Sequence, residues 1–478
     1  MERNPRIRPR ILHVIEQLAP GGAATALVET ARHLAAGGQQ HRVLSLVRPV
    51  AAASDYAARA GLAVVDGGEI AADDTIDRLI AEADIVWVHA WTSPVLDAFL
   101  RRPHPPARWL IWLHVAGDSA PHMLTPSLAA FPDLLVASSP YTATRPVFAN
   151  APAQTAIVLA SGDLGGFSEA RVTPPGPDFR IGYIGTLDAA KMHPDFVTLS
   201  RAANLPPARF DIYGRGADGA RLRAEIDASR DLRFGLRGWA TDVPAALATM
   251  DAFGYPLARN SHATAELVLQ EAMAAGVPPV ILDHGAAVHL VDHERTGLIA
   301  RDEADYPRCL ERLAADPALR RRLGEAARHH ALSCFGAVRA ARAFEPLVAS
   351  LLARPRQARV WPDRADTGAD RFLAALGTAA EVFAASRNGE NDAADAAIVT
   401  VSPALASATS GGILHWRRCY PDDPWLRFWS GLVHRGQGRM VPALGELMRA
   451  RALGIAAPGL DRHIAECVEA TTRTSQGA

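Results

Sequence analysis

Short apolar segments alternate with helical segments along the first two thirds of this 478-residue chain, and this rhythm constrains its fold more than any other feature. Residues 11–15 (ILHVI) form a nearly continuous apolar run, typical of a strand covered on both faces. A glycine-containing loop follows, and residues 23–36 then have the spacing of a helix that ends at Gly37 and Gly38. Further strand-like runs continue the alternation: HRVLSLV, LAVV, IVWVHAW, RWLIWLHV, LLVAS and AIVLA. The pattern predicts an α/β fold built on a doubly wound parallel sheet.

The alternation stops once and starts again, which predicts a second domain. Residues 162–178 are rich in Gly and Pro and lack periodicity, so they are predicted to be an interdomain linker. Strand-like and helical segments then resume at FRIGYIG, and helices up to about residue 352 close this half. We expect one Rossmann-like domain over residues 1–165 and another over residues 178–354. A cleft between two such domains is a common place for a ligand.

The composition changes again after the segment PRQARVWP, and the remaining sequence has a mostly helical pattern. Residues 363–478 are therefore expected to form a helical C-terminal domain. Gly431, Ala443 and Ala450 match three small-residue positions of the roughly 34-residue tetratricopeptide pattern, where two helices pack closely. The match is partial, so an ordinary helical cap is the alternative interpretation.

Charge and cysteine content exclude several classes of protein. Lys and Arg number 50 against 51 Asp and Glu, so no global basic field exists to hold nucleic acid or an anionic membrane. The four cysteines are far apart and form no CxxC pair, which indicates free thiols in a reducing compartment. The N-terminus is a poor signal peptide, and no window of about 18 residues is apolar enough for a transmembrane helix. We predict a cytoplasmic location, and leave open a peripheral contact with the inner face of the membrane.

Three segments at the predicted cleft could bind a phosphorylated ligand. Gly21 and Gly22 separate the first strand from the first helix, where the backbone can approach a ligand and the helix offers free N–H groups. Lys191 follows the first strand of the second half and could reach a phosphate. Thr264 is a predicted N-cap of a helix that runs to about Ala275. A plain tight turn and a solvated surface lysine are the alternatives for the first two.

Glu271 is a carboxylate within that otherwise apolar helix, between Leu269 and Met273. Burial of an unpaired charge is costly, so the side chain needs partners. The two hydroxyls of a ribose would satisfy it as a two-pronged acceptor. A neighbouring backbone group or an arginine is the alternative partner.

The stretch from residue 10 to about residue 335 resembles a GT-B glycosyltransferase of the retaining family 4 type (glycosyl transferases group 1). The matching segments occur in the family's order: ILHVIEQLAPGGAATALVETARHLAAGG, IVWVH, LHVAGD, VASSPYTA, IGTLDAAK, IYGRG, ELVLQEAMAAGVPPVIL and HERTGLIA. The segment EAMAAGVP is the most specific of them. The resemblance implies a nucleotide-sugar donor held mainly by the second half and a saccharide or glycolipid acceptor held mainly by the first. It also implies transfer with retention of anomeric configuration, without a metal or other cofactor.

The resemblance assigns roles to individual residues as well. Glu271 matches the ribose-binding second glutamate of the family's E-x7-E element, and Lys191 matches the lysine that binds the donor diphosphate. Gly22 matches the phosphate-side glycine loop, and His114 in LHVAGD matches the histidine near the transferred sugar. The expected catalytic residues are therefore His114 and Glu271, and the expected donor-binding residues are Gly21, Gly22, Lys191, Thr264, Glu266 and Glu271.

Three positions depart from the family's pattern. The first glutamate of E-x7-E falls at Ala263, which has no carboxylate, and Glu266 is the nearest substitute. The usual arginine before the lysine falls at Thr186, and the usual glutamate after the glycine turn falls at His289. These departures indicate an unusual donor or a weakened enzyme. A non-catalytic scaffold that binds a protein partner through residues 363–478 is therefore the alternative function.

Overall fold

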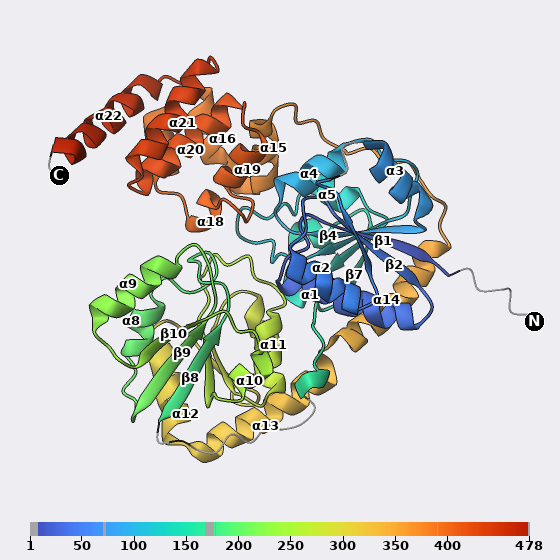
Figure 1. The fold of residues 1–478 in the computed structure, drawn as a ribbon, viewed down its shortest axis with the longest axis vertical. Helices are drawn as coiled ribbons and strands as arrows, with labels where there is room; N and C mark the ends of the chain where they lie inside the picture. Colours follow the sequence, from blue (N-terminus) through green and yellow to red (C-terminus); the bar gives the residue numbers. More distant parts are fainter. Residues whose placement is uncertain (1–7, 70–72, 168–175, 177, 390, 477–478) are drawn as a thin grey trace, which may run out of the picture.

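The computed structural model describes residues 8–69, 73–167, 176, 178–389 and 391–476 of the chain. These residues form two parallel sheets covered by helices, and a separate helical region beside them (Figure 1). Much of the predicted interdomain linker, residues 168–175 and 177, lies outside the described part. The expected α/β class with a mostly helical C-terminal region is confirmed.

The first domain contains a seven-stranded parallel sheet in the order β3-β2-β1-β4-β5-β6-β7. Its strands are β1 (Arg10–Ile15), β2 (Gln40–Ser45), β3 (Ala63–Asp66), β4 (Ile85–Ala90), β5 (Trp109–Leu113), β6 (Leu134–Ala137) and β7 (Gln154–Ile157). Its helices are α1 (Gly22–Ala36), α2 (Ala51–Arg59), α3 (Asp73–Glu82), α4 (Pro94–Arg101), α5 (Pro126–Ala130), α6 (Pro140–Ala143) and α7 (Pro146–Ala149). Every residue of β4 and β5 is buried, as their apolar runs predict for strands covered on both faces.

The second domain repeats this plan with a six-stranded parallel sheet in the order β10-β9-β8-β11-β12-β13. Its strands are β8 (Phe179–Ile184), β9 (Ala208–Tyr213), β10 (Phe234–Gly238), β11 (Ala252–Tyr255), β12 (Pro279–Leu282) and β13 (Leu298–Ala300). Its helices are α8 (Phe196–Arg201), α9 (Gly219–Ser229), α10 (Val243–Leu247), α11 (Leu267–Ala274), α12 (Tyr306–Ala315) and α13 (Pro317–Cys334). In each sheet the strand order reverses beside the domain's first strand. Such switch points are where open α/β sheets bind ligands.

Helix α14 (Ala337–Leu352) crosses back to the first domain, although the helical pattern suggested that it closes the second. It packs against α1, and its Phe344 ring lies 4.3 Å from the ring of Trp87 and 4.9 Å from that of Trp112, between centroids. Its apolar face therefore completes the core of the first domain. Periodicity shows that this helix has a buried face, but it does not show which sheet covers that face.

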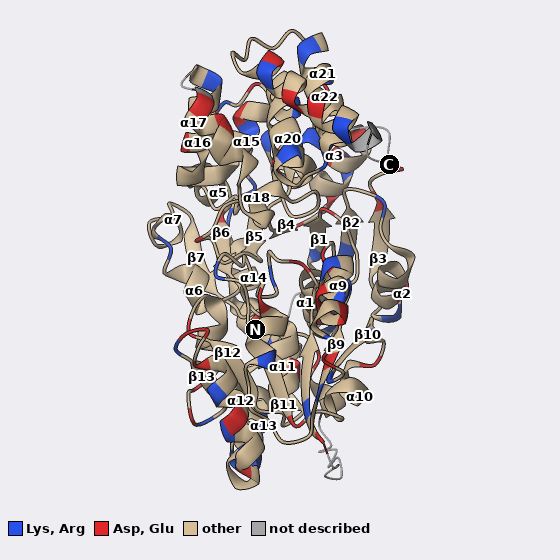
Figure 2. Cartoon of the chain, turned by 90° about the vertical axis from the view of Figure 1, so that its left-hand side faces the viewer, with Lys and Arg blue, Asp and Glu red and all other residues tan. Residues whose placement is uncertain are grey.

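Eight α-helices and one short 3₁₀ turn (Gly377–Ala379) make up the described part of the C-terminal extension, which we define as residues 363–478. The α-helices are α15 (Gly368–Leu376), α16 (Ala380–Asn388), α17 (Asn391–Val399), α18 (Pro403–Ala406), α19 (Ile413–Cys419), α20 (Pro424–Gly436), α21 (Met440–Ala452) and α22 (Leu460–Gln476). Gly431 allows α20 and α21 to pack closely, because an added Cβ would lie 2.7 Å from the Leu447 side chain. Acidic and basic residues are interspersed on these helices (Figure 2). None of the described helices has the length and apolar character needed to cross a membrane.

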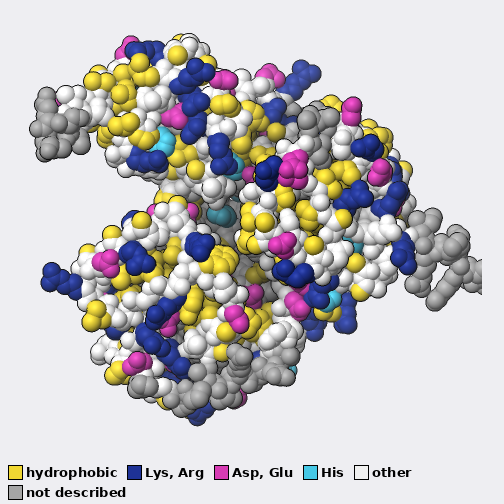
Figure 3. Space-filling model, in the orientation of Figure 1, with side chains coloured by type: hydrophobic (Ala, Val, Ile, Leu, Met, Phe, Trp, Pro, Cys, Tyr) yellow, Lys and Arg dark blue, Asp and Glu magenta, His cyan; other side chains and the backbone are white. Residues whose placement is uncertain are grey.

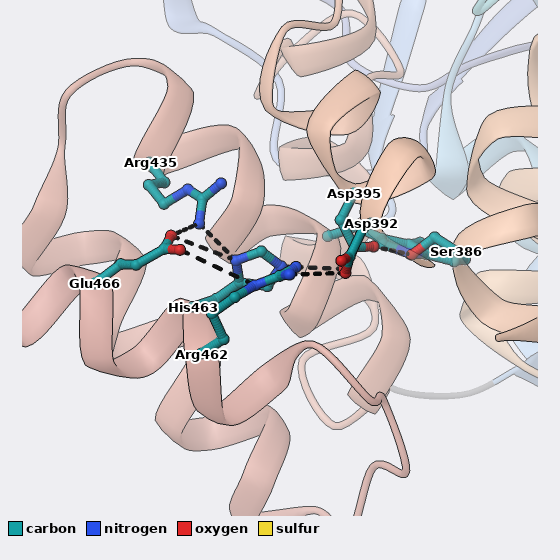
Figure 4. Close-up of polar contacts among 8 residues, drawn as sticks. Ser386, Asp392, Asp395, Arg435, Arg462, His463 and Glu466 are labelled. Carbon is teal, nitrogen blue, oxygen red and sulfur yellow. Dashed lines mark hydrogen bonds and ion pairs between the residues drawn. The ribbon is translucent and has the colours of Figure 1, made fainter. Parts of the chain in front are cut away.

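A polar network centred on the buried Asp395 and His463 links four helices of the extension (Figure 4). Asp395 accepts a hydrogen bond of 2.7 Å from the Ser386 hydroxyl on one oxygen and lies 3.0 Å from His463 Nε2 on the other. Arg435 donates to His463 Nδ1 at 2.5 Å and pairs with Glu466. Arginine can only donate, so His463 must carry its proton on Nε2 and donate it to Asp395. The network thus links α16, α17, α20 and α22 through a carboxylate that is 1 % exposed.

The extension is packed against the first domain where β1 and β4 end. Helix α19 contacts α4, and His415 Nε2 lies 3.3 Å from a carboxylate oxygen of Glu16. The other oxygen of Glu16 accepts a 2.9 Å hydrogen bond from the indole N–H of Trp91. The extension is therefore joined to the carboxyl-terminal edge of the first sheet.

Candidate active site

A cavity of about 430 Å³ lies between the two α/β domains, at the loops that follow β1, β4, β5, β8 and β11. In the space-filling view, the surface is hollowed where the extension faces the second domain (Figure 3). The cavity is lined by most of the residues that the sequence singles out: Gly21, Gly22, His114, Lys191, Thr264 and Glu266. Segments that are remote in sequence thus meet at one place, with Glu271 adjacent to it.

The N-terminus of α1 faces this cavity. The helix begins at Gly22, has no side-chain cap and has no acidic residue in its first turn. An added Cβ at Gly21 would meet no atom within 4 Å, and one at Gly22 would meet only Leu267 of the second domain, at 3.7 Å. The first N–H groups of α1 are therefore accessible, and the helix dipole favours an anion beside them.

Lys191 is carried by a loop that is hydrogen-bonded and closely packed within the second domain. The N–H of Ala189 donates to Asp218 at 2.6 Å. Gly214 and Gly216 allow the next loop to approach: added Cβ atoms would lie 1.9 Å from the Gly185 carbonyl and 2.2 Å from the Leu187 carbonyl oxygen. Gly214 and Gly216 are thus explained by close backbone packing against the loop that carries Lys191.

Glu266 lies beside Lys191 and forms an ion pair with it. Its Oε2 atom is 3.2 Å from Lys191 Nζ and accepts a hydrogen bond from the hydroxyl of Tyr255. Burial, together with Glu266, holds the pKa of Tyr255 well above its usual value, so this hydroxyl remains a donor. A diphosphate at Lys191 would therefore have to compete with an internal carboxylate.

The predicted N-cap at Thr264 is wrong. Helix α11 begins three residues later, at Leu267, because Glu266 adopts a left-handed conformation with φ of 37° and ψ of 68°. Thr264 instead lies against the first domain, with its hydroxyl 3.2 Å from that of Thr142 and 3.5 Å from that of Ser138. The residue lines the cavity and joins the two domains, but it does not cap the helix.

Glu271 lies on α11 one turn beyond Leu267, which lines the cavity. Its carboxylate points toward Gly162, where an added Cβ would lie 3.8 Å from Oε1. Burial raises the pKa of Glu271 to about 7. Among the described residues, none donates a hydrogen bond to this carboxylate. The side chain is therefore a partly buried acceptor whose partners could come from a ligand.

His114 is the first ring in a chain of four hydrogen-bonded histidines that runs across the first sheet. The distances are 3.2 Å from His114 Nε2 to His89 Nδ1, 3.0 Å from His89 Nε2 to His13 Nδ1, and 2.8 Å from His13 Nε2 to His41 Nδ1. Burial lowers the pKa of His114 to about 3 and that of His41 to about 4, and lowers the pKa of the two rings between them well below the usual value. Four neutral rings can bond only as N–H···N, so their tautomers are coupled. At neutral pH, His114 can hydrogen-bond a ligand, but it cannot donate a proton as an imidazolium.

Several cavity residues were not found from the sequence. Trp91 ends the strand-like run IVWVHAW and His262 precedes the segment ELVLQEAMAAGVPPVIL, but no spacing signal marks either as a site residue. Thr409 and Ser410 reach the cavity from the extension, and no local pattern connects them with it. Ala263 lines the cavity without a carboxylate, as the sequence shows. In the described ranges, no group of three or more His, Cys, Asp or Glu could hold a metal ion.

Comparison with solved structures shows that the two α/β domains have the GT-B fold. The Anabaena protein Alr3699/HepE in complex with UDP has a TM-score of 0.59 and 18% identity, over 71% of this chain and 100% of that chain. A glycosyltransferase from Rickettsia africae has a TM-score of 0.60 and 14% identity, over 73% and 100%. Sucrose-phosphate synthase from Thermosynechococcus elongatus has a TM-score of 0.57 and 17% identity, over 72% and 100%.

Sequence comparison adds a family match in the second domain. Residues 178–316 match the family Glycosyl transferases group 1. A GDP-mannose-dependent alpha-mannosyltransferase of Mycolicibacterium smegmatis is 34% identical over 162 residues, which are 33% of this chain and 40% of that protein. A protein of the same name from Mycobacterium tuberculosis is 33% identical over 119 residues, or 25% and 29%. The chain thus spans less than half the length of these curated relatives.

Proposed function

We propose that this protein is a nucleotide-sugar-dependent glycosyltransferase that transfers a sugar to a saccharide or glycolipid acceptor with retention of anomeric configuration. One observation carries the proposal: residues from both α/β domains, singled out by sequence, surround one cavity at the switch points of the two sheets. The family match at residues 178–316 supports the assignment of the donor to the second domain.

In this proposal, the protein itself supplies the positive charge that a leaving diphosphate needs. Lys191 provides a cation, and the open N-terminus of α1 provides N–H groups and the positive end of a dipole. Groups fixed where negative charge develops stabilise the transition state without reorganisation, so the reaction does not require a metal. Glu271 would accept hydrogen bonds from the ribose hydroxyls, and the neutral ring of His114 would orient the transferred sugar. Exclusion of water from the cavity would limit hydrolysis of the donor.

The sequence relatives favour GDP-mannose as the first donor to test, because both are named as GDP-mannose-dependent. UDP sugars are the second choice, given the UDP complex of the Anabaena protein. The reaction would take place in the cytoplasm, with peripheral contact at the inner face of the membrane when the acceptor is a glycolipid.

A thermal-shift panel of GDP-, UDP- and ADP-sugars on the full chain tests donor binding, since a ligand that binds the folded state raises its stability. NMR detection of the released sugar then tests turnover and shows whether the first product is the retained anomer. Glu271→Ala should abolish turnover while the folded state persists. Release of the inverted anomer would contradict retention, and absence of a shift with every nucleotide sugar would contradict the proposal.

A catalytically weakened scaffold is the second candidate, and two observations favour it. Ala263 lacks the carboxylate that the family resemblance leads one to expect. Lys191 is already paired with Glu266, which competes with a diphosphate for the lysine. The extension would then bind a protein partner, in line with its expected tetratricopeptide-like character. Absence of nucleotide binding, together with capture of a partner that depends on the extension, would support this reading.

A further inference from the structure

The C-terminal extension contributes directly to the cavity. Thr409 and Ser410, in the loop between α18 and α19, line it together with Trp91 and Thr92 of the first domain. Figure 1 shows α18 reaching from the body of the extension toward the two α/β domains. Recruitment of a distant partner alone would not require side chains of the extension at the cavity.

This loop is held in one conformation by its own hydrogen bonds. The hydroxyl of Ser407 accepts from the N–H groups of Thr409 at 3.2 Å and Ser410 at 3.0 Å. The N–H of Gly411 donates to His415 Nδ1 at 3.2 Å. Since His415 also faces Glu16 of the first domain, the loop and the domain share one polar network.

The loop also fits closely against the first domain. Gly411 has φ of +76°, a conformation that favours glycine, and an added Cβ would lie 2.0 Å from the Cγ2 atom of Thr92. The hydroxyl of Thr92 is turned away, to the carbonyl of Pro121 at 2.9 Å. Backbone contact at Gly411 therefore fixes where Thr409 and Ser410 meet the cavity.

Trp91, Thr409 and Ser410 form one wall of the cavity, and their side chains have the chemistry of a saccharide site. The indole of Trp91 is partly exposed, and its N–H is held by Glu16, so the ring has a fixed orientation. Thr409 is exposed and Ser410 is partly exposed, so both hydroxyls can reach a ligand. An aromatic face packs against the apolar face of a sugar ring, while neutral hydroxyls pair with sugar hydroxyls. Lys191, the cation that lines the described cavity, belongs to the second domain, so this wall favours a neutral ligand.

We propose that the extension completes the acceptor site, in which a neutral saccharide lies against Trp91 and is hydrogen-bonded by Thr409 and Ser410. The inference rests on the proposed function, because it divides the cavity between donor and acceptor. It also gives the extension a role in acceptor specificity, in place of a role confined to protein recruitment.

Saturation-transfer NMR on the full chain tests this proposal. The probes are methyl α-mannoside, methyl α-glucoside and methyl α-galactoside, each added to protein that holds its best nucleotide from the thermal-shift panel. The double variant Thr409→Val/Ser410→Ala should lower the signal of the bound glycoside at least fivefold. The matched control is Thr400→Val, an exposed threonine of the extension that does not line the cavity. This control should leave the glycoside signal unchanged, and nucleotide affinity should be the same in all three proteins.

Nucleotide binding with no glycoside signal would overturn the inference while the proposed function stands. A glycoside signal that the double variant leaves intact would do the same. Loss of the signal in Thr400→Val as well would also contradict it, because the effect would then not come from the cavity wall. Failure of every nucleotide to bind would instead contradict the proposed function itself.

Discussion

The ion pair between Lys191 and Glu266 allows a quantitative prediction, because its two members differ in exposure. The side chain of Glu266 is 3% exposed and that of Lys191 is 27% exposed, at a separation of 3.2 Å. Two unit charges about 4 Å apart attract by about 4 kcal/mol at an effective dielectric constant near 20. Lys191→Met leaves the more deeply buried carboxylate without a cation, with only the Tyr255 hydroxyl as donor, which should cost about 3–5 kcal/mol of folding free energy. Glu266→Gln leaves a lysine that can reach water, and should cost about 1 kcal/mol.

Scanning calorimetry of the two single variants and the double variant measures these costs. For a domain of this size, 1 kcal/mol shifts Tm by about 2–4 °C, so Lys191→Met should lower the Tm of the second domain by roughly 6–20 °C. The double variant should recover most of this loss, because no unpaired charge remains. An unchanged Tm in Lys191→Met would refute the pairing argument.

Titration of the same variants with a nucleotide sugar measures how each substitution changes the binding affinity. Lys191→Met should weaken binding by about 1.5–3 kcal/mol, the value of a charge-assisted hydrogen bond. Glu266→Gln should strengthen binding, because it removes a negative charge that competes with the diphosphate for Lys191. Weaker binding in Glu266→Gln would show the opposite, namely that Glu266 contacts the donor in place of the carboxylate absent at Ala263.

Three further predictions concern titratable side chains: Glu271, His114 and Asp395. Burial raises the pKa of Glu271 from 4.5 to about 7, so the folded protein loses stability as pH rises from about 4.5 to about 7 and this carboxyl ionises. Because the ionised carboxylate is the form that accepts the ribose hydroxyls, nucleotide-sugar affinity should rise about tenfold from pH 6 to pH 8 by titration calorimetry. A rise that persists in Glu271→Gln would contradict this. Burial lowers the pKa of His114 to about 3, so its ring should remain neutral down to pH 5 by ¹⁵N NMR, and titration above pH 6 would refute this. Asp395→Ala removes the buried partner of His463 and should destabilise the extension by about 3–5 kcal/mol. Asp392→Ala removes an exposed carboxylate and should cost less than about 1 kcal/mol. Equal losses by calorimetry would argue against the network around Asp395.

The fold could be predicted from the sequence because parallel strands are recorded in local composition. IVWVHA in β4 is apolar almost throughout, since both of its faces are covered, and the rhythm of such runs repeats in two halves. Helix α14 shows where this reasoning stops. Its amphipathic pattern indicates a buried face, but the sheet that covers this face belongs to the first domain, and the whole second domain lies between them in the sequence.

The lining of the cavity could be predicted in part for the same reason. Gly21 and Gly22 follow a strand of the first sheet and Lys191 follows a strand of the second, and the carboxyl ends of both strands lie at the same cavity. The sequence predicts an N-cap at Thr264, because nothing in its neighbours signals the left-handed conformation of Glu266 after which the helix begins. The cavity wall from the extension depends on tertiary packing at Gly411, which no local pattern encodes.

A crystal structure of the full chain grown with a saturating nucleotide sugar tests the central claim most directly. We predict a diphosphate between the N-terminus of α1 and Lys191 Nζ, with the ribose hydroxyls at Glu271. A nucleotide bound elsewhere, or a cavity that contains none at saturating concentration, would contradict the account.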